Sequence, residues 1–281
     1  MATADAERIG PTAHYTGYVW KRLGLPHADL FATRTGAVLY WGFFALGEWT
    51  TRLSPGVPSM RQYLEYRHRL IDAVVDELRP DPIVEIGAGL TRRAVTWAAD
   101  RETNAIEFDL PAMTRLKREA LDRAPVQLRA RLIGRHRVLD ADLLQPAFVE
   151  AFVSAVGQGA RPVVIAEGVL SYFDPDGRAR LLAHVAEGLR RVGGGTLVCD
   201  CHTAQAQAEV GVAAKVLRTA IRTVTRRKRA LDPFADRDAL HRGFAEAGFD
   251  ATQVVEAADY VSRDSRLRGL HSPAHVVVAR C

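Results

Sequence analysis

Residues 83 to 89 read Ile-Val-Glu-Ile-Gly-Ala-Gly, a short apolar stretch that ends in two glycines separated by one residue. The apolar part predicts a buried strand over 83–86. Gly87 and Gly89 lack a Cβ, so the backbone can turn sharply here and approach a ligand closely. Twenty residues beyond Gly89, Asp109 ends a second apolar run, where an acidic side chain can accept both hydroxyls of a ribose. The pattern predicts a nucleoside site at one edge of a doubly wound α/β sheet.

The third position of the glycine fingerprint indicates which nucleoside is favoured. Dinucleotide-binding proteins place a third glycine there to pack helix on strand, whereas this chain has Arg92. A bulky charged side chain at that point argues against a pyrophosphate on the turn. The shorter pattern of Glu85, Gly87 and Gly89 suits S-adenosylmethionine, which has no phosphate to bind. Nucleotide-dependent redox chemistry on a similar sheet is the competing interpretation.

Composition limits the class of protein. With 281 residues, 48% of them hydrophobic, the chain can bury the core of one large domain with an appended subdomain. The sequence contains no run of about 18 apolar residues, so no membrane span is predicted. The N-terminus does not resemble a signal peptide, and we therefore expect a cytoplasmic protein. Cys199 and Cys201 alternate in a predicted strand without a second pair, which favours packing and predicts no metal site.

Strand-like and helical segments alternate from Asp81 onward, which is typical of a mostly parallel sheet with helices on both faces. Five strands are predicted at 83–86, 104–108, 136–139, 162–166 and 196–201. Residues 249–256 and 275–279 predict a final antiparallel pair, which makes seven strands. We expect a helical N-terminal cap over 1–78, a core over 79–281, and a helical insertion near 205–232.

The N-terminal zone is unusually aromatic. Nine of the 21 aromatic residues lie between Tyr15 and Trp49, at spacings that mainly predict packing between helices. We expect a few of them to line a substrate pocket, namely Tyr15, Tyr18, Tyr40 and Trp41. The methyl acceptor or other substrate would then have an apolar or aromatic body.

A basic segment accounts for the positive net charge of +5. Lys215 to Arg229 contains seven basic residues and no acidic one, and its apolar residues recur at helical spacing. The simplest interpretation is a solvated lid helix. An acidic carrier protein that delivers a substrate is an alternative, while nucleic acid is disfavoured because aromatic residues are not interleaved with the charges. The sequence does not indicate the oligomeric state.

Polar residues follow each of the five predicted parallel strands, where open α/β sheets bind ligands. In this order and spacing, the chain resembles the leucine carboxyl methyltransferase family of class I S-adenosylmethionine-dependent O-methyltransferases, which includes polyketide-tailoring enzymes. The stretches that carry the resemblance lie between about residues 60 and 200: Arg67-His-Arg-Leu-Ile-Asp72, Gly87-Ala-Gly-Leu90 with Arg93, Glu107-Phe-Asp-Leu-Pro111, Asp142-Leu143, and Glu167-Gly-Val-Leu170 with Tyr172. The resemblance implies a Rossmann-like methyltransferase of class EC 2.1.1.

The resemblance also implies roles for individual residues. Arg67 would pair with the methionine carboxylate, and Glu167 would lie near the amino end of the methionine, as charge complementarity favours. The remaining predicted contacts to S-adenosylmethionine, or to its product S-adenosylhomocysteine, are Glu85, Gly87, Ala88, Gly89, Asp109, Leu110, Asp142, Leu143 and Gly168. The family usually has Leu-Asp-Thr-Arg after the glycines, whereas this chain has Thr91 in place of the Asp. Without that Asp, the sequence does not show which side chain forms the hydrogen bonds of the turn.

The two possible classes of methyl acceptor, carboxylates and phenols, differ in whether they need a general base. A carboxylate is already ionised at neutral pH and needs none, whereas a phenol needs a base such as His202 or His14. Tyr172 and His202 are the candidate catalytic residues, although packing or a structural role is an equal or better explanation for each. The resemblance favours methyl-ester formation on a small carboxylate of secondary metabolism, with hydroxyl methylation as the alternative.

Overall fold

The computed structural model describes residues 2–45, 59–209 and 232–281 and contains a single seven-stranded sheet. The strands are β1 Ile83–Ile86, β2 Ala105–Asp109, β3 His136–Asp140, β4 Val163–Ala166, β5 Thr196–His202, β6 Ala251–Val255 and β7 Ala274–Arg280. Their order in the sheet is β3-β2-β1-β4-β5-β7-β6, and only β7 runs antiparallel to its neighbours. The predicted fold, including the antiparallel pair at the end, is confirmed.

The central strands form because they are apolar at nearly every position, with Glu85 the one polar residue of β1 and β4. All four residues of β1 and all four of β4 are buried, as expected for strands covered on both faces. β1 pairs with β2 on one side and with β4 on the other, both in parallel. The chain order therefore reverses at β1, and the connections that leave the carboxyl ends of β1 and β4 lead to helices on opposite faces of the sheet, which is where such sheets bind ligands.

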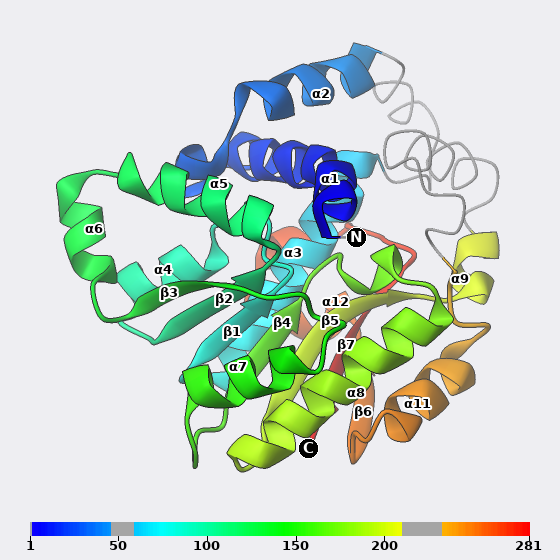
Figure 1. Ribbon diagram of the computed structural model, residues 1–281. Helices are drawn as coiled ribbons and strands as arrows, with labels where there is room; N and C mark the ends of the chain where they lie inside the picture. The colour runs from blue at the N-terminus through cyan, green and yellow to red at the C-terminus, as the bar shows by residue number, and fades with distance from the viewer. Residues whose placement is uncertain (1, 46–58, 210–231) are drawn as a thin grey trace.

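Helices cover both faces of the sheet (Figure 1). They are α1 Ala2–Arg22, α2 Arg34–Ala45, α3 Met60–Leu78, α4 Arg93–Asp100, α5 Pro111–Asp122, α6 Val126–Leu132, α7 Ala147–Val156, α8 Pro175–Val192, α9 Ala204–Glu209, α11 Arg237–Glu246 and α12 Ala257–Tyr260. Short 3-10 turns are η1 Ala28–Phe31, η3 Leu170–Tyr172 and η4 Ser265–Leu267. None of the helices in the described ranges is long and apolar enough to cross a membrane.

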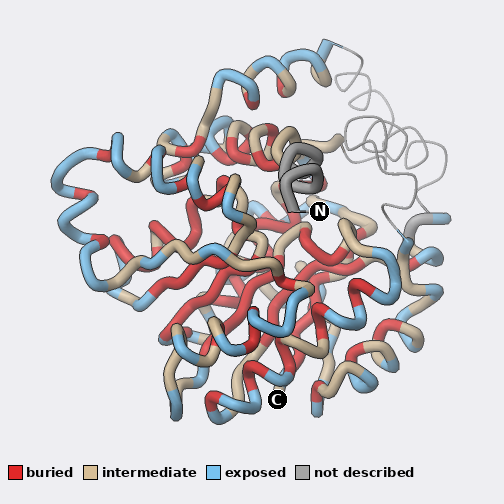
Figure 2. Tube along the Cα trace, viewed as in Figure 1, coloured by how far each residue is buried: buried red, intermediate tan, exposed pale blue. Residues whose placement is uncertain are grey.

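Two apolar layers lie on opposite sides of the strands, because successive strand residues point to opposite faces. One layer packs α3, α4, α5 and α6 against strand residues such as Ile83 and Val198. The other packs α7, α8 and α11 against residues such as Val84 and Leu197. Figure 2 shows the result as a buried sheet beneath helices that are exposed on their outer sides.

The N-terminal helices lie over the carboxyl ends of the strands, where Figure 1 shows α1 and α2. A Cβ on Gly89 would come within 3.3 Å of the Cβ of Ala13, so α1 sits directly on the glycine turn. α3 differs from α1 and α2, because its apolar residues Leu70 and Val74 belong to the core layer on the sheet. The boundary of the cap at residue 78 stays a prediction. The basic segment 215–229 lies outside the described residues.

Candidate functional site

The glycine turn after β1 has the geometry that the sequence predicts. Gly87 and Gly89 have φ values of 59° and 53°, in the left-handed region that favours glycine. A Cβ on Gly87 would lie 2.7 Å from Cγ2 of Val169, so that position also lacks room for a side chain. The turn is tied to the next strand, because the Gly87 amide donates to the carbonyl oxygen of Phe108 at 2.8 Å.

Asp109 lies at the tip of β2 and joins the turn directly. Its Oδ2 accepts a 2.6 Å hydrogen bond from the Gly89 amide, and its Oδ1 accepts one of 2.7 Å from the amide of Leu110. Each oxygen keeps a further lone pair for a ligand. Burial raises the pKa of Asp109 above its ordinary value, while the two amides counteract this. The structure therefore brings together the glycines, Asp109 and Leu110, as predicted.

The predicted adenine contacts lie at the end of the next strand. The amide of Ala141 donates to the carbonyl oxygen of Asp109 at 2.8 Å, so the loop after β3 is held against the tip of β2. In that loop Asp142 caps the turn by accepting from the Leu144 amide at 3.1 Å. Leu143 is buried in the apolar layer, and Ala88 is buried within the glycine turn. Their adenine-binding roles stay predictions.

Glu85 lies beneath the turn and is fully engaged by the protein. Its Oε1 accepts from Arg93 at 2.7 Å, and its Oε2 accepts from the Thr91 hydroxyl at 2.8 Å and from the Ala94 amide at 3.1 Å. Glu85 therefore holds the turn and the start of α4, and its contact with the cofactor stays a prediction. Thr91 stands where the family usually has Asp, and its hydroxyl donates to Glu85. A carboxylate at position 91 could not donate this hydrogen bond while ionised.

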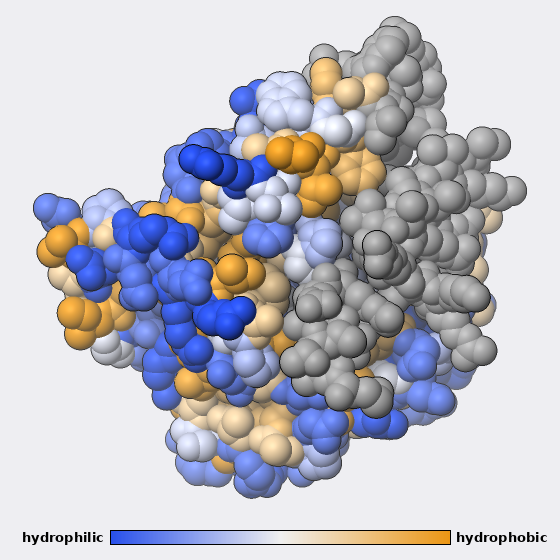
Figure 3. Space-filling model, turned by 45° about the horizontal axis from the view of Figure 1, so that its top comes forward, coloured by the Kyte–Doolittle hydropathy of each residue, from blue (hydrophilic) through white to orange (hydrophobic). Residues whose placement is uncertain are grey.

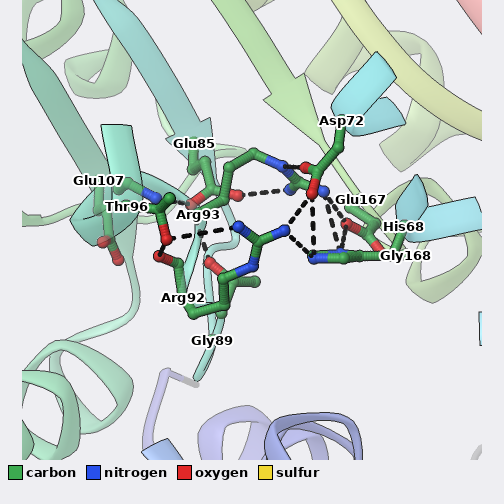
Figure 4. A network of polar contacts seen from close by, with 12 residues as sticks. His68, Asp72, Glu85, Gly89, Arg92, Arg93, Thr96, Glu107, Glu167 and Gly168 are labelled. Carbon is green, nitrogen blue, oxygen red and sulfur yellow. Dashed lines mark hydrogen bonds and ion pairs between the residues drawn. The ribbon is translucent and has the colours of Figure 1, made fainter. Parts of the chain in front are cut away.

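A buried ionic network joins α3 to the ends of β4 and β5, and Figure 4 shows its part around Asp72, Arg93 and Glu167. Arg67 donates from Nε to Glu167 at 3.1 Å and from Nη1 to Asp200 at 3.3 Å. Asp200 also accepts from the Gly168 amide at 2.5 Å. A Cβ on Gly168, which has φ 70°, would lie 3.1 Å from the guanidinium group. Arg67 thus packs against bare backbone, next to Glu167 and Gly168.

Three cationic or polar partners surround Glu167. Besides Arg67, His68 Nδ1 lies 2.9 Å from its Oε2, and Arg93 donates to the same oxygen at 2.7 Å. Burial alone would raise the pKa of Glu167, but these partners hold it well below its ordinary value. Burial lowers the pKa of His68, whose ring stacks on Trp20 with centroids 4.0 Å apart.

Asp72 closes the network from the next turn of α3. It pairs with Arg92 and accepts from Arg93 Nε at 2.6 Å, so one carboxylate serves two neighbouring guanidinium groups. Arg92, which argued against a dinucleotide, is therefore a buried structural cation held by α3. Sequence analysis did not anticipate this pairing. The helical spacing of Arg67, His68 and Asp72, at i, i+1 and i+5, gave the only signal for it.

A second buried group supports the turn from α5. Lys117 donates to the carbonyl oxygen of Thr91 at 2.7 Å and pairs with Glu107 at 2.6 Å. Glu107 also contacts His136 at 2.8 Å, so this carboxylate links β2 to both α5 and β3. Lys117 was not predicted to belong to the site, because it is one charged residue of a helix without a recognisable motif around it.

Of the candidate catalytic residues, His202 is connected to this network through Tyr63, whose hydroxyl accepts from Arg67 Nη1 at 3.5 Å. Nε2 of His202 at the end of β5 is 3.0 Å from the hydroxyl of Tyr63, and the two rings stack. Burial lowers the pKa of His202 to about 4. Tyr172 ends η3 and is half-buried. His14, the other candidate base, contacts the Thr33 hydroxyl at 2.9 Å.

The four predicted substrate contacts occupy different environments. Tyr15 and Tyr40 are buried in a cluster between α1 and α2, with ring centroids 6.2 Å apart. Tyr18 packs on the same cluster, whereas Trp41 is 49% exposed. Apolar side chains are exposed on this end of the molecule in Figure 3. The substrate roles of these residues stay predictions.

The family model described as leucine carboxyl methyltransferase matches residues 26–186, which is more than half of the chain and contains the glycine turn and most of the ionic network. The chain belongs to the leucine carboxyl methyltransferase family. The predicted enzyme class, an S-adenosylmethionine-dependent methyltransferase, is confirmed at the level of this family. No curated protein sequence matches closely enough to add to the assignment.

Solved structures agree with the family assignment at the level of the fold. A candidate methyltransferase from Thermobifida fusca is 14% identical, with a TM-score of 0.56 over 95% of this chain and 93% of that one. An O-methyltransferase family protein from Burkholderia thailandensis is 18% identical, with a TM-score of 0.51 over 99% and 76%. PigF, solved with S-adenosylhomocysteine, is 12% identical, with a TM-score of 0.51 over 75% and 54%. This chain also spans only 62% of a candidate O-methyltransferase from Nostoc punctiforme.

Proposed function

We propose that the protein methylates a carboxylate oxygen of a small molecule with S-adenosylmethionine as the donor. The observation that carries the donor site is the 2.6 Å hydrogen bond between the amide of Gly89 and Asp109, which fixes a side-chain-free turn beside an acid. In this proposal Asp109 accepts the ribose hydroxyls. The Arg67 guanidinium pairs with the methionine carboxylate, since its Nη2 has no bonding partner among residues 2–45, 59–209 and 232–281.

The choice of a carboxylate is supported by the weakness of the available base. A phenol has a pKa near 10 and reacts well only after losing its proton. With a pKa of about 4, His202 is too weak a base to remove that proton efficiently. A carboxylate needs no base: its oxygen attacks the methyl carbon, the S–CH3 bond breaks, and the electron pair returns to sulfur. Alignment of the two reactants then supplies most of the rate.

A labelled donor distinguishes the two acceptor classes. The protein is incubated with S-adenosylmethionine labelled in the methyl group and with matched carboxylic acids and phenols. Mild alkali releases volatile labelled methanol from a methyl ester but not from an aryl ether. We expect base-labile product from the acids only. Base-stable product from phenols, with none from acids, would overturn the proposal in favour of hydroxyl methylation.

The donor half has its own test. Calorimetric titration with S-adenosylhomocysteine should show binding, and the same titration with NAD should show none. Binding of NAD alone would overturn the proposed donor. A carrier-bound acceptor, suggested by the sequence of the segment 215–229, remains the second candidate. It predicts that turnover falls as moderate salt screens the encounter, whereas a small free acceptor predicts little change.

A further inference from the structure

A small pocket opens beside the ionic network, at the carboxyl end of β5. It is lined by residues from η3, the first turns of α8, the end of β5 and the segment before α11: Leu170, Ser171, Arg178, Asp200, Cys201, His202, Asp232, Pro233 and Phe234. One of its walls is Asp200, whose carboxylate accepts from both Arg67 and the Gly168 amide. The pocket therefore adjoins the residues proposed to bind the methionine end of the donor.

Arg178 differs from the other buried arginines of the described residues. Arg67, Arg69, Arg92 and Arg93 each have a carboxylate oxygen within ion-pairing distance. Arg178 is only 8% exposed, yet no carboxylate from the described part of the chain lies within that distance. Burying a guanidinium group without an anion is costly, and burial lowers the pKa of Arg178.

The orientation of Arg178 leaves one edge of its guanidinium group available. Nη1 donates to the carbonyl oxygen of Asp232 at 2.5 Å, and the group stacks on the ring of Phe234, 4.0 Å from its centroid. These two contacts fix the plane of the group. The edge formed by Nε and Nη2 makes no hydrogen bond to any described residue. That edge carries the two parallel N–H groups that bind a carboxylate in a bidentate way.

The other charged groups that face the pocket do not oppose an anion strongly. The carboxylate of Asp200 is already engaged by Arg67 and the Gly168 amide. His202 is neutral above pH 5 or so, since burial lowers its pKa to about 4. Asp232 is exposed and offers its backbone carbonyl oxygen to Arg178, and its carboxylate raises the pKa of Arg178 from beyond ion-pairing distance, by less than burial lowers it. The pocket thus combines one buried cation, which forms no ion pair with a carboxylate of the described residues, with apolar walls from Leu170, Pro233 and Phe234.

We propose that the Nε–Nη2 edge of Arg178 binds the carboxylate of the methyl acceptor in this pocket, an inference that rests on the proposed function. Arg178 then holds the reacting group next to the methionine end of the donor. Methyl transfer neutralises the carboxylate and removes its attraction to the guanidinium group. The pocket consequently binds the ester product less tightly than the acid.

Benzoate and its uncharged analogue benzamide test the proposal on protein saturated with S-adenosylhomocysteine. Saturation-transfer NMR measures the affinity for each probe in the wild-type protein and in the variants Arg178→Gln and Arg178→Lys. The matched control is Arg180→Gln, which removes an exposed arginine from the same helix. We expect benzoate to bind the wild-type protein at least about tenfold more tightly than benzamide, as a charge-assisted hydrogen bond provides.

We expect Arg178→Gln to lose that preference, Arg178→Lys to retain part of it, and Arg180→Gln to retain all of it. Affinity for S-adenosylhomocysteine should be equal in all four proteins, which also shows that the variants are folded. Equal binding of benzoate and benzamide, an unchanged preference in Arg178→Gln, or no benzoate binding would overturn the proposal. Failure of S-adenosylhomocysteine to bind the wild-type protein would instead overturn the proposed donor site.

Discussion

Replacement of Asp109 by alanine tests the donor site most directly. In the folded protein this carboxylate accepts from two backbone amides, at 2.6 and 2.7 Å, and in our proposal it also accepts the two ribose hydroxyls. A hydrogen bond to a charged group contributes about 1.5–3 kcal/mol, so the loss of two costs the ligand at least about 3 kcal/mol. That free energy corresponds to a decrease in affinity of more than about 100-fold.

The same change should leave the protein folded. The amides of Gly89 and Leu110 lose their acceptor, at about 1–3 kcal/mol each if water does not replace it, against a typical total stability of about 5–15 kcal/mol. Calorimetry with S-adenosylhomocysteine measures the affinity, and urea unfolding measures the stability. Asp122→Ala, an exposed acid at the end of α5, is the control. A dissociation constant of Asp109→Ala within about threefold of wild type would refute the ribose assignment.

Three further predictions concern the support of this site. Arg93→Met leaves three carboxylates without a shared cation and should lower the free energy of unfolding by about 3–5 kcal/mol in urea titrations, more than Arg93→Lys does. The pKa of His202 is lower in the folded state than its ordinary 6.5, so stability should fall as pH decreases from 6.5 toward about 4; urea titrations of His202→Gln should lack that component of the pH dependence. Gly87→Ala places a methyl group 2.7 Å from Val169 at a positive φ, so calorimetry should show weaker binding of S-adenosylhomocysteine. Adding Val169→Ala to this variant should restore only part of the affinity, because it removes the clash but not the backbone strain.

The sheet and the donor edge could be predicted because their signals are local. The run 83–89 contains a buried strand and two glycines, and both glycines have the positive φ that this pattern favours. Asp109 was found in the same way, by its position after the next apolar run. The pattern of the last two apolar segments also predicted the antiparallel pairing of β6 with β7.

The ionic support of the site could not be predicted because it depends on contacts between distant segments. Asp72 and Arg93 are 21 residues apart, and Arg67 and Asp200 are 133 apart. Sequence placed Glu85 at the cofactor, whereas the structure shows its oxygens engaged by Arg93, the Thr91 hydroxyl and the Ala94 amide. In general, a charged residue read alone looks either solvated or ligand-binding, and only its partners reveal a structural role.

The same ionic network has a consequence for turnover. It contains the carboxylates of Asp72, Glu85, Glu167 and Asp200 and the guanidinium groups of Arg67, Arg92 and Arg93. With His68 neutral because burial lowers its pKa, four negative charges face three positive ones. A zwitterionic amino acid that also carries a sulfonium has one positive charge in excess and complements this imbalance. In the proposed donor site, transfer of the methyl group removes that charge from the ligand, so we expect S-adenosylhomocysteine to be held less strongly than the S-adenosylmethionine that replaces it.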